Sequence, residues 1–367
     1  MTKLLRIVTL LLLAPAGAYC HTLDQPPHRM AVLGDLELEE GGAIPNLRMS
    51  YVTHGKLNST KSNAILFLHD LGGNHHSGDH LIGPGKALDS DKYFIICVDE
   101  LGNSQTTFEH STSPTNSGLK MRFPHYKGRD QVNAGYRLVT QALRIPRLLA
   151  VTGVSSGADQ AVQMAVSHPD FMEAIIPISG GALWTTDGVG FTGLALSVLE
   201  SCSGWLGGNY EVNPVKCAAD AMMIFVPYFY TREWWEQHID TAGAYTKWRN
   251  TWGAHHFDLQ DARDVYYRQV ANSRGWVGDT PGFNGWPAAL RSIKARALFL
   301  ASPYDHFVPR QLYEIQVKMI PQGRISWVDS TAGHLVCCDA DANATRAMSE
   351  AITAFLKELM AQKKDKN

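Results

Sequence analysis

The chain has 367 residues, of which 45% are apolar, and its 33 basic and 35 acidic side chains give a formal net charge of −2. This length and composition predict a globular chain with one large domain, or with one domain that carries an insertion. The near-neutral charge balance argues against nucleic acid, and against an anionic membrane surface, as a partner.

The first eighteen residues have the pattern of a secretory signal peptide. Lys3 and Arg6 precede a short apolar run, Ile7 to Leu13, and the small residues 16–18 follow as a cleavage site. The apolar run is too short to span a bilayer comfortably, so a retained anchor is the minor alternative. We therefore expect cleavage near Ala18 and an exported protein, periplasmic or secreted, without stable membrane association.

Short apolar runs alternate with helical patterns from about residue 31 to residue 180. We predict strands at 64–68, 93–98, 148–151 and 175–178, and helices at 132–143 and 157–168. This alternation predicts an α/β fold with a mostly parallel sheet that is covered by helices on both faces.

The pentapeptide GVSSG, residues 153–157, lies between one of these strands and the helix that follows it. Strand, G-x-S-x-G and helix in succession are typical of the nucleophile elbow of the α/β-hydrolase fold. The alternative is a structural turn with an idle serine, but the context favours Ser155 as a catalytic nucleophile. The same turn would direct the backbone N–H of Ser156 toward the reacting centre, as one donor of an oxyanion hole.

A polar loop, residues 69–80, follows the strand at 64–68 and holds four histidines and two aspartates. In an α/β-hydrolase the loop after an early strand supplies the second oxyanion donor, and we assign it to the backbone N–H of Leu71, beside Gly72 and Gly73. The histidines and aspartates would also suit a metal site. A solvated loop over a cleft explains the same polarity without a closed ligand set, so we expect neither a metal nor a cofactor.

Strand patterns cease between about residues 182 and 290, where many tryptophans lie among helical stretches. We predict a helical lid over 182–290, inserted between a first core segment, 19–181, and a second, 291–367. Most of these tryptophans should form the lid's own core and some should line the cleft. They are Trp205, Trp234, Trp235, Trp248, Trp252, Trp276 and Trp286.

Two further predicted strands, 297–301 and 325–328, are each followed by a candidate catalytic side chain. Asp305 follows the first and His334 the second, which places both at the sheet edge where the serine is expected. The chain order serine, aspartate, histidine is that of α/β-hydrolases. His334 would take the serine's proton and Asp305 would orient the imidazole ring. Asp329 is the rival acid, disfavoured by its closeness in sequence to His334. The alternatives to these roles are an ordinary surface histidine and a turn-forming aspartate.

The six cysteines do not form a dense disulfide framework in a chain of this length. Export would permit disulfides, and Cys202 and Cys217 could close a loop. A cystine between Cys337 and Cys338 could brace the histidine loop. The sequence leaves the pairing open among Cys20, Cys97, Cys202, Cys217, Cys337 and Cys338.

Several other segments resemble the homoserine O-acetyltransferase group of α/β-hydrolases. They are residues 45–51 (PNLRMSY), 55–58 (GKLN), 81–89 (LIGPGKALD) and 93–97 (YFIIC). The resemblance covers about residues 31–180 and 290–360. It implies the same three catalytic residues, Ser155, Asp305 and His334, and a homodimer formed through the lid.

The chain departs from that group at the elbow and in the lid. The acetyltransferases usually follow the serine with methionine and two glycines, where this chain has Ser-Gly-Ala at 156–158. The lid segment that aligns with 214–223 holds Lys216 and Asp220, and not the arginine that helps to hold the amino-acid acceptor. We therefore do not expect homoserine to be the acceptor. We also do not expect acetyl-CoA to be the acyl donor, because it is not expected outside the cytosol.

These observations favour an exported serine hydrolase that cleaves a small-molecule carboxylic ester through an acyl-enzyme at Ser155. An O-acyltransferase that moves the acyl group to an alcohol is the alternative, because both reactions share the acyl-enzyme. A non-enzymatic binding module on the same fold is the least favoured reading, because a complete triad would be idle in it.

Overall fold

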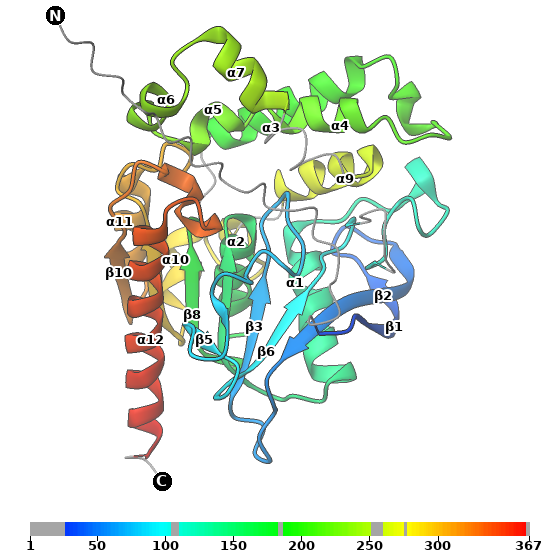
Figure 1. Cartoon of the computed structure of the whole chain (residues 1–367). Coiled ribbons are helices and arrows are strands. Elements are labelled where there is room, and N and C mark those ends of the chain that lie inside the picture. The colour runs from blue at the N-terminus through cyan, green and yellow to red at the C-terminus, as the bar shows by residue number, and fades with distance from the viewer. Residues whose placement is uncertain (1–25, 104–109, 183–185, 251–259, 275–276, 365–367) are drawn as a thin grey trace, which may run out of the picture.

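The computed structural model describes residues 26–103, 110–182, 186–250, 260–274 and 277–364. An eight-stranded sheet lies at its centre, in the order β1-β2-β6-β3-β7-β8-β9-β10 (Figure 1). Its strands are β1 (Arg29–Glu37), β2 (Ala43–His54), β3 (Ala64–Leu68), β6 (Phe94–Val98), β7 (Leu148–Val154), β8 (Met172–Ile178), β9 (Arg296–Ala301) and β10 (Gly323–Trp327). Two short strands, β4 (Ile82–Gly83) and β5 (Leu88–Asp89), form a separate parallel pair.

The sheet is parallel from β6 to β10. Strand β2 pairs antiparallel with both β1 and β6, which adds an antiparallel edge that the sequence pattern did not reveal. The interior strands β3 and β7 consist of buried residues along their whole length. Such unbroken burial is typical of a parallel sheet that is covered on both faces, and it confirms the predicted fold class.

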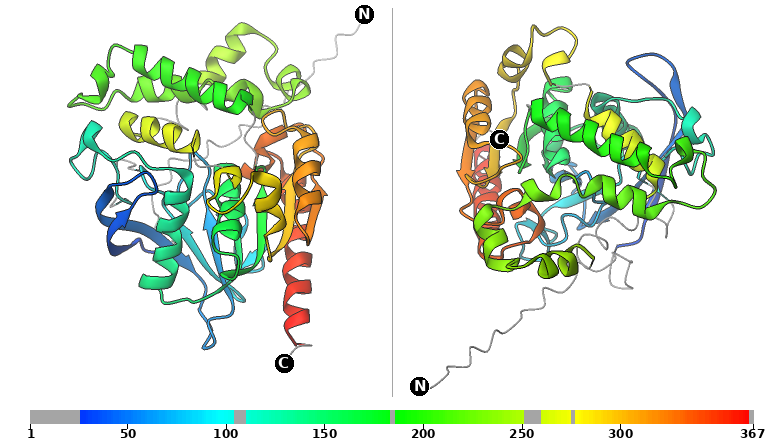
Figure 2. Two further views of the ribbon diagram at one scale, coloured as in Figure 1. Left: turned by 180° about the vertical axis from the view of Figure 1, so that it is seen from behind. Right: turned by 90° about the horizontal axis from the view of Figure 1, so that it is seen from above.

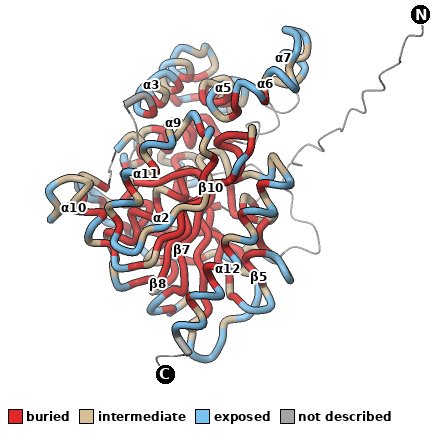
Figure 3. The backbone as a smooth tube through the Cα atoms, turned by 90° about the vertical axis from the view of Figure 1, so that its left-hand side faces the viewer, coloured by how far each residue is buried: buried red, intermediate tan, exposed pale blue. Residues whose placement is uncertain are grey.

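Side-chain alternation along each strand builds two hydrophobic cores. Leu66 and Leu68 of β3 face one core, while Ile65 and Phe67 face the other. The first core is covered by α1 (Gly128–Arg137), α2 (Ser156–Ser167), α10 (Trp286–Arg291) and α11 (Arg310–Met319). The second core is covered by the long helix α12 (Ala342–Lys364). Figure 3 shows this burial concentrated along the strands, with exposed residues on the outer turns.

Helix α1 is shorter than the helix predicted at 132–143. It ends at Arg137 and continues as a π-helical turn, η2 (Leu138–Ala142). A 3₁₀ turn, η1 (Lys120–Arg122), lies in the connection before it.

A layer of helices, called the lid below, lies over the edge of the sheet at the carboxyl ends of the parallel strands, as Figures 1 and 2 show. It consists of α3 (Thr186–Ser201), η3 (Leu206–Gly208), α4 (Val215–Met222), α5 (Val226–Phe229), α6 (Arg232–His238), α7 (Ala242–Trp248) and α9 (Ala262–Asn272). Trp205 and Trp234 are buried in small clusters within this layer, as expected for a lid with its own core. Trp252 and Trp276 lie outside the described residues.

The helical layer ends earlier than the predicted boundary at residue 290. The first of the two sheet cores includes apolar side chains from the segment that follows α9. They are Val277, in the turn η5 (Val277–Asp279), and Ala289 and Leu290, in α10. Their apolar side chains pack against the sheet-covering helices, so residues 277–291 are part of the core domain. Among the described residues, no helix is both long enough and apolar enough to cross a bilayer. The predicted signal peptide lies outside the described residues.

Candidate active site

Ser155 occupies the sharp turn between β7 and α2. Its backbone has φ 52° and ψ −119°, a strained conformation for a residue with a side chain. A Cβ on Gly157 would lie 2.3 Å from the carbonyl oxygen of Leu68, and one on Gly153 would lie 2.4 Å from that of Gly157. Both positions therefore require glycine, because the turn packs directly against the end of β3. The Ser155 N–H donates to Ile178 O (2.9 Å), which ties the turn to β8.

His334 and Asp305 meet Ser155 at this end of the sheet. The Ser155 Oγ lies 3.0 Å from His334 Nε2, and His334 Nδ1 lies 2.9 Å from Asp305 Oδ2. His334 is in the 3₁₀ turn η6 (Gly333–Cys338) that follows β10, and Asp305 is in the loop after β9. Asp329, the rival acid, is exposed, whereas Asp305 is only 4% exposed. The structure thus brings together the three side chains that the sequence singled out, and their roles as nucleophile, base and acid stay predictions.

The carboxylate of Asp305 is fixed by four donors. Its Oδ1 accepts hydrogen bonds from the backbone N–H groups of Phe307 (2.8 Å) and Val308 (2.9 Å). The Tyr313 hydroxyl donates to Oδ2 (3.3 Å), beside the bond from His334. With both oxygens occupied, the carboxylate has one orientation, and it holds the imidazole in the tautomer with its proton on Nδ1.

The pKa of His334 results from two opposed effects. Burial alone would lower it, since the ring is only 2% exposed, but the charge and the hydrogen bond of Asp305 outweigh burial and raise the pKa to about 9. The neutral ring, the form that can accept a proton from a serine hydroxyl, is therefore populated as the pH rises toward 9.

Two aromatic side chains, one from the lid and one from the loop after β9, lie beside the His334 ring, and sequence reasoning missed both. Phe229, at the end of α5, stacks on the His334 ring with centroids 5.6 Å apart, and Phe307 lies 5.0 Å from the same ring. The backbone N–H and the hydroxyl of Thr231 both donate to Thr331 O, which fastens the lid to the histidine loop. Phe229 and Thr231 are far in sequence from Asp305 and His334, so their contacts carry no local sequence signal.

The loop after β3 is held from the lid as well. Arg268 of α9 donates to Leu71 O (2.6 Å), and Gln260 donates to Gly72 O (3.0 Å). Asn103 donates to Gly73 O (3.1 Å), so three consecutive carbonyls of the predicted oxyanion loop accept hydrogen bonds from buried side chains. The loop begins against the first turn of α2, because a Cβ on Gly157 would lie 2.6 Å from His69 O. The oxyanion roles of the Leu71 and Ser156 N–H groups stay predictions.

The histidine-rich part of this loop is not solvated as expected. The side chains at 74–76 are buried. Hydrogen bonds to carboxylates compensate for the burial of the two histidines: His75 Nδ1 donates to Asp99 (2.7 Å) and His76 Nδ1 donates to Asp79 (2.8 Å). The expectation of a solvated loop is therefore wrong for residues 74–76.

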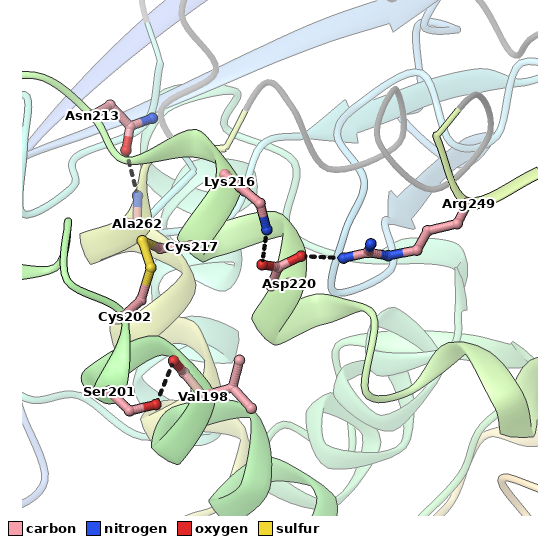
Figure 4. The surroundings of a disulfide bond; sticks show 9 residues. All are labelled: Val198, Ser201, Cys202, Asn213, Lys216, Cys217, Asp220, Arg249 and Ala262. Atoms are coloured by element: carbon pink, nitrogen blue, oxygen red, sulfur yellow. Dashed lines mark hydrogen bonds and ion pairs between the residues drawn. A yellow bond between two sulfur atoms is a disulfide. The ribbon is translucent and has the colours of Figure 1, made fainter. Parts of the chain in front are cut away.

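Cys202 and Cys217 form a disulfide between α3 and α4. Figure 4 shows it beside Asp220, which binds both Lys216 and Arg249, the latter at 2.6 Å. Arg249, which follows α7, thus lies next to residues 214–223, the segment that aligns with the arginine-bearing lid segment of the acetyltransferases, and it is paired with the Asp220 carboxylate.

The remaining described cysteines are free thiols, and Cys97 is buried as its strand pattern indicated. Cys337 and Cys338 are not joined by a disulfide; their sulfur atoms lie 2.8 Å apart, in hydrogen-bond contact. Cys337 Sγ also lies 3.4 Å from His334 O, which accepts a hydrogen bond from the thiol. Cys20 lies outside the described residues.

Comparison with known proteins agrees with this architecture. The family model described as alpha/beta hydrolase fold matches residues 63–341. A protein of Corynebacterium glutamicum named as a probable esterase is 31% identical, over 85% of this chain and 90% of its own. A homoserine O-acetyltransferase of Symbiobacterium thermophilum is 32% identical, over 89% of this chain and 93% of its own. The crystal structure of the acetyl esterase MekB superposes with a TM-score of 0.83 at 26% identity, over 91% of this chain and 97% of that chain. The chain therefore belongs to the homoserine O-acetyltransferase-like group of the α/β-hydrolase fold family and is an enzyme of this class.

Proposed function

We propose that the chain hydrolyses a small-molecule carboxylic ester through an acyl-enzyme on Ser155. The observation that carries this proposal is the continuous contact from Ser155 Oγ through His334 to the buried carboxylate of Asp305. The sequence relative named as a probable esterase and the structural likeness to an acetyl esterase support it.

In the proposed mechanism, Ser155 Oγ attacks the ester carbonyl carbon while its proton passes to His334 Nε2. Asp305 stabilises the imidazolium that forms, and the N–H groups of Leu71 and Ser156 donate to the oxyanion. His334 then gives its proton to the departing alcohol. Water attacks the acyl-enzyme, again with His334 as the base, and releases the carboxylic acid and free Ser155.

Acyl transfer to an alcohol is the second candidate, because full-length relatives are named homoserine O-acetyltransferases. Hydrolysis is favoured by the lid contacts around Asp220. The charges of Arg249 and Lys216 are both paired with the Asp220 carboxylate, so neither is left as a single positive charge for the carboxylate of an amino-acid acceptor.

Product analysis separates the two reactions. The purified chain and Ser155→Ala would each receive a short acetyl ester or acetyl-CoA, with and without homoserine, and products would be measured by mass spectrometry. We expect free acetate from the ester, unaffected by homoserine and lost in the variant. O-acetylhomoserine formed at the expense of acetate would contradict hydrolysis as the main activity.

Export is part of the proposal. The basic and apolar pattern of residues 1–18 supports it, and so does the Cys202–Cys217 disulfide, because disulfides persist mainly in oxidising compartments. N-terminal sequencing of the mature protein tests it. We expect a terminus near residue 19, whereas an intact Met1 in the cytosolic fraction would count against export.

A homodimer through the lid also stays a proposal. Large apolar side chains are exposed on the lid, among them Val189 and Leu194 of α3 and Val212 before α4. Sedimentation equilibrium of the wild type and of Leu194→Asp tests it. A dimer that the variant dissociates is expected, and a monomeric wild type would contradict it.

A further inference from the structure

Three histidines outside the proposed catalytic residues gather at one point. They are His28, just before β1, and His75 and His76, in the loop between β3 and β4. One nitrogen of each ring lies within 4.8 Å of those of the other two. The rings of His28 and His75 have centroids 4.4 Å apart, and those of His75 and His76 have centroids 4.3 Å apart.

Two of these rings are oriented by carboxylates. The Nδ1 of His75 donates to Asp99 Oδ1 (2.7 Å), and the Nδ1 of His76 donates to Asp79 Oδ2 (2.8 Å). A carboxylate on one ring nitrogen fixes the tautomer and increases the basicity of the other nitrogen, and metal-binding histidines almost always have such a partner. Both buried members of the cluster therefore have the outer hydrogen bond that a metal ligand requires.

The fold holds the three segments together independently of any metal. Arg29 of β1 and Val98 of β6 both pair with Tyr51 of β2. His28, which precedes Arg29, and Asp99, which follows Val98, therefore lie in the same part of the sheet. Asp99 also accepts from the backbone N–H of His75 (3.0 Å), which anchors the loop on the end of β6. His75 and His76 are 3% and 4% exposed, and His28 is half-buried.

We propose that His28, His75 and His76 bind one divalent transition-metal ion of the zinc class, with a water or another ligand in the fourth position. Imidazole nitrogens suit Zn²⁺, Co²⁺, Ni²⁺ and Cu²⁺, and zinc binds them at about 2.0–2.1 Å. Tetrahedral ligands at that distance are roughly 3.3 Å apart, so nitrogens that now lie within 4.8 Å of one another must move closer together to bind one ion. The ion would pin the start of β1 to the loop that also carries Leu71.

The cluster can also be read as two structural histidine–aspartate pairs with a third ring packed against them. The two interpretations differ in a measurable property, because only the metal site binds one equivalent of cation and needs His28 to do so.

The test uses the purified protein after treatment with a chelator. Titration with Co²⁺ is followed by its visible absorption, titration with Zn²⁺ by calorimetry, and thermal unfolding is recorded with and without Zn²⁺. We expect one equivalent bound per chain, a tetrahedral cobalt spectrum and a higher Tm with zinc, because a ligand that binds only the folded state stabilises it.

His28→Gln and His76→Gln should each abolish stoichiometric binding, and His28→Gln removes a half-buried ring with little loss of core packing. His238→Gln, which changes an exposed histidine of the lid, is the matched control and should bind as the wild type does. Ser155→Ala should also bind normally, which separates this proposal from the proposed ester hydrolysis. No stoichiometric binding, or binding that survives in folded His28→Gln and His76→Gln, would overturn the proposal.

Discussion

Arg268→Met removes the guanidinium that ties α9 to the loop after β3. In the folded chain this buried side chain donates to Leu71 O (2.6 Å) and to Gln260 Oε1 (2.5 Å), and Gln260 donates to Gly72 O. Methionine fills much of the volume of the arginine stem but donates no hydrogen bond. We expect kcat to fall while KM changes little, because an oxyanion donor acts on charge that develops in the transition state.

The size of the effect follows from the bond that is lost. A hydrogen bond from a charged group contributes about 1.5–3 kcal/mol, and about 1.4 kcal/mol is a tenfold change in rate. If that energy holds the loop in its active conformation, kcat falls by about 10- to 150-fold. This is smaller than the roughly 100- to 1000-fold loss on removing an oxyanion donor itself, as expected for a positioning residue.

Arg263→Met is the matched control. Arg263 is a second buried arginine of α9, but its guanidinium donates to Gly208 O (2.6 Å) and Tyr210 O (2.5 Å) in the lid and to the Thr115 hydroxyl (3.2 Å), and not to the loop after β3. Hydrolysis of a chromogenic acetyl ester, inhibition by a boronic acid that forms a tetrahedral adduct, and urea unfolding would be measured for both variants. Both should lose stability, and only Arg268→Met should lose kcat and boronate affinity. An unchanged kcat in Arg268→Met, or an equal loss in both variants, would refute the reasoning.

Three further predictions concern the base, the disulfide and the elbow. Because the pKa of His334 is raised from 6.5 to about 9, its protonation contributes about 3 kcal/mol of stability that is fully present below pH 6.5 and is lost as the pH rises through 9. The neutral base accumulates over the same interval, so kcat/KM should rise with pH, and Asp305→Asn should move the midpoint to lower pH as well as slow the reaction. A pH-independent rate would contradict this. Replacing both members of the Cys202–Cys217 disulfide with serine should destabilise the lid by about 3 kcal/mol, given a separation of 15 residues. Hydrogen exchange in α3 and α4 reports the loss, and unchanged protection there would argue against it. Gly157→Ala should abolish activity, since its Cβ would lie 2.3 Å from a backbone oxygen of β3, whereas Gly135→Ala, whose nearest neighbour is a side-chain atom at 3.7 Å, should keep activity and stability. Equal activity of the two variants would refute the steric argument.

The interior of the sheet and the three central site residues were predictable because their signals are local. Strands that are buried on both faces are unbroken apolar runs, and Ser155 lies in a motif with a fixed strand-turn-helix context. Asp305 follows the buried strand β9 and His334 follows the edge strand β10, so the carboxyl edge of a parallel sheet brings them together.

The supports around these residues had no local signal. Arg268 and Leu71 are 197 positions apart, and Gln260 and Gly72 are 188 apart, so only the folded chain reveals their hydrogen bonds. The loop at 74–76 was expected to be solvated because it is polar. The buried His75 ring is paired with Asp99, which lies 24 residues later and just after β6, and such a charged partner cannot be read from the loop itself.

The most direct test of the central claim is to trap the acyl-enzyme. The wild type and Ser155→Ala would be mixed with a rapidly acylating acetyl ester, quenched in acid during the first turnover, digested and analysed by mass spectrometry. The account predicts one acetyl group on the peptide that contains Ser155, its decay in water, and no label or turnover in the variant. Turnover that persists in Ser155→Ala, or acetylation confined to another residue, would contradict it.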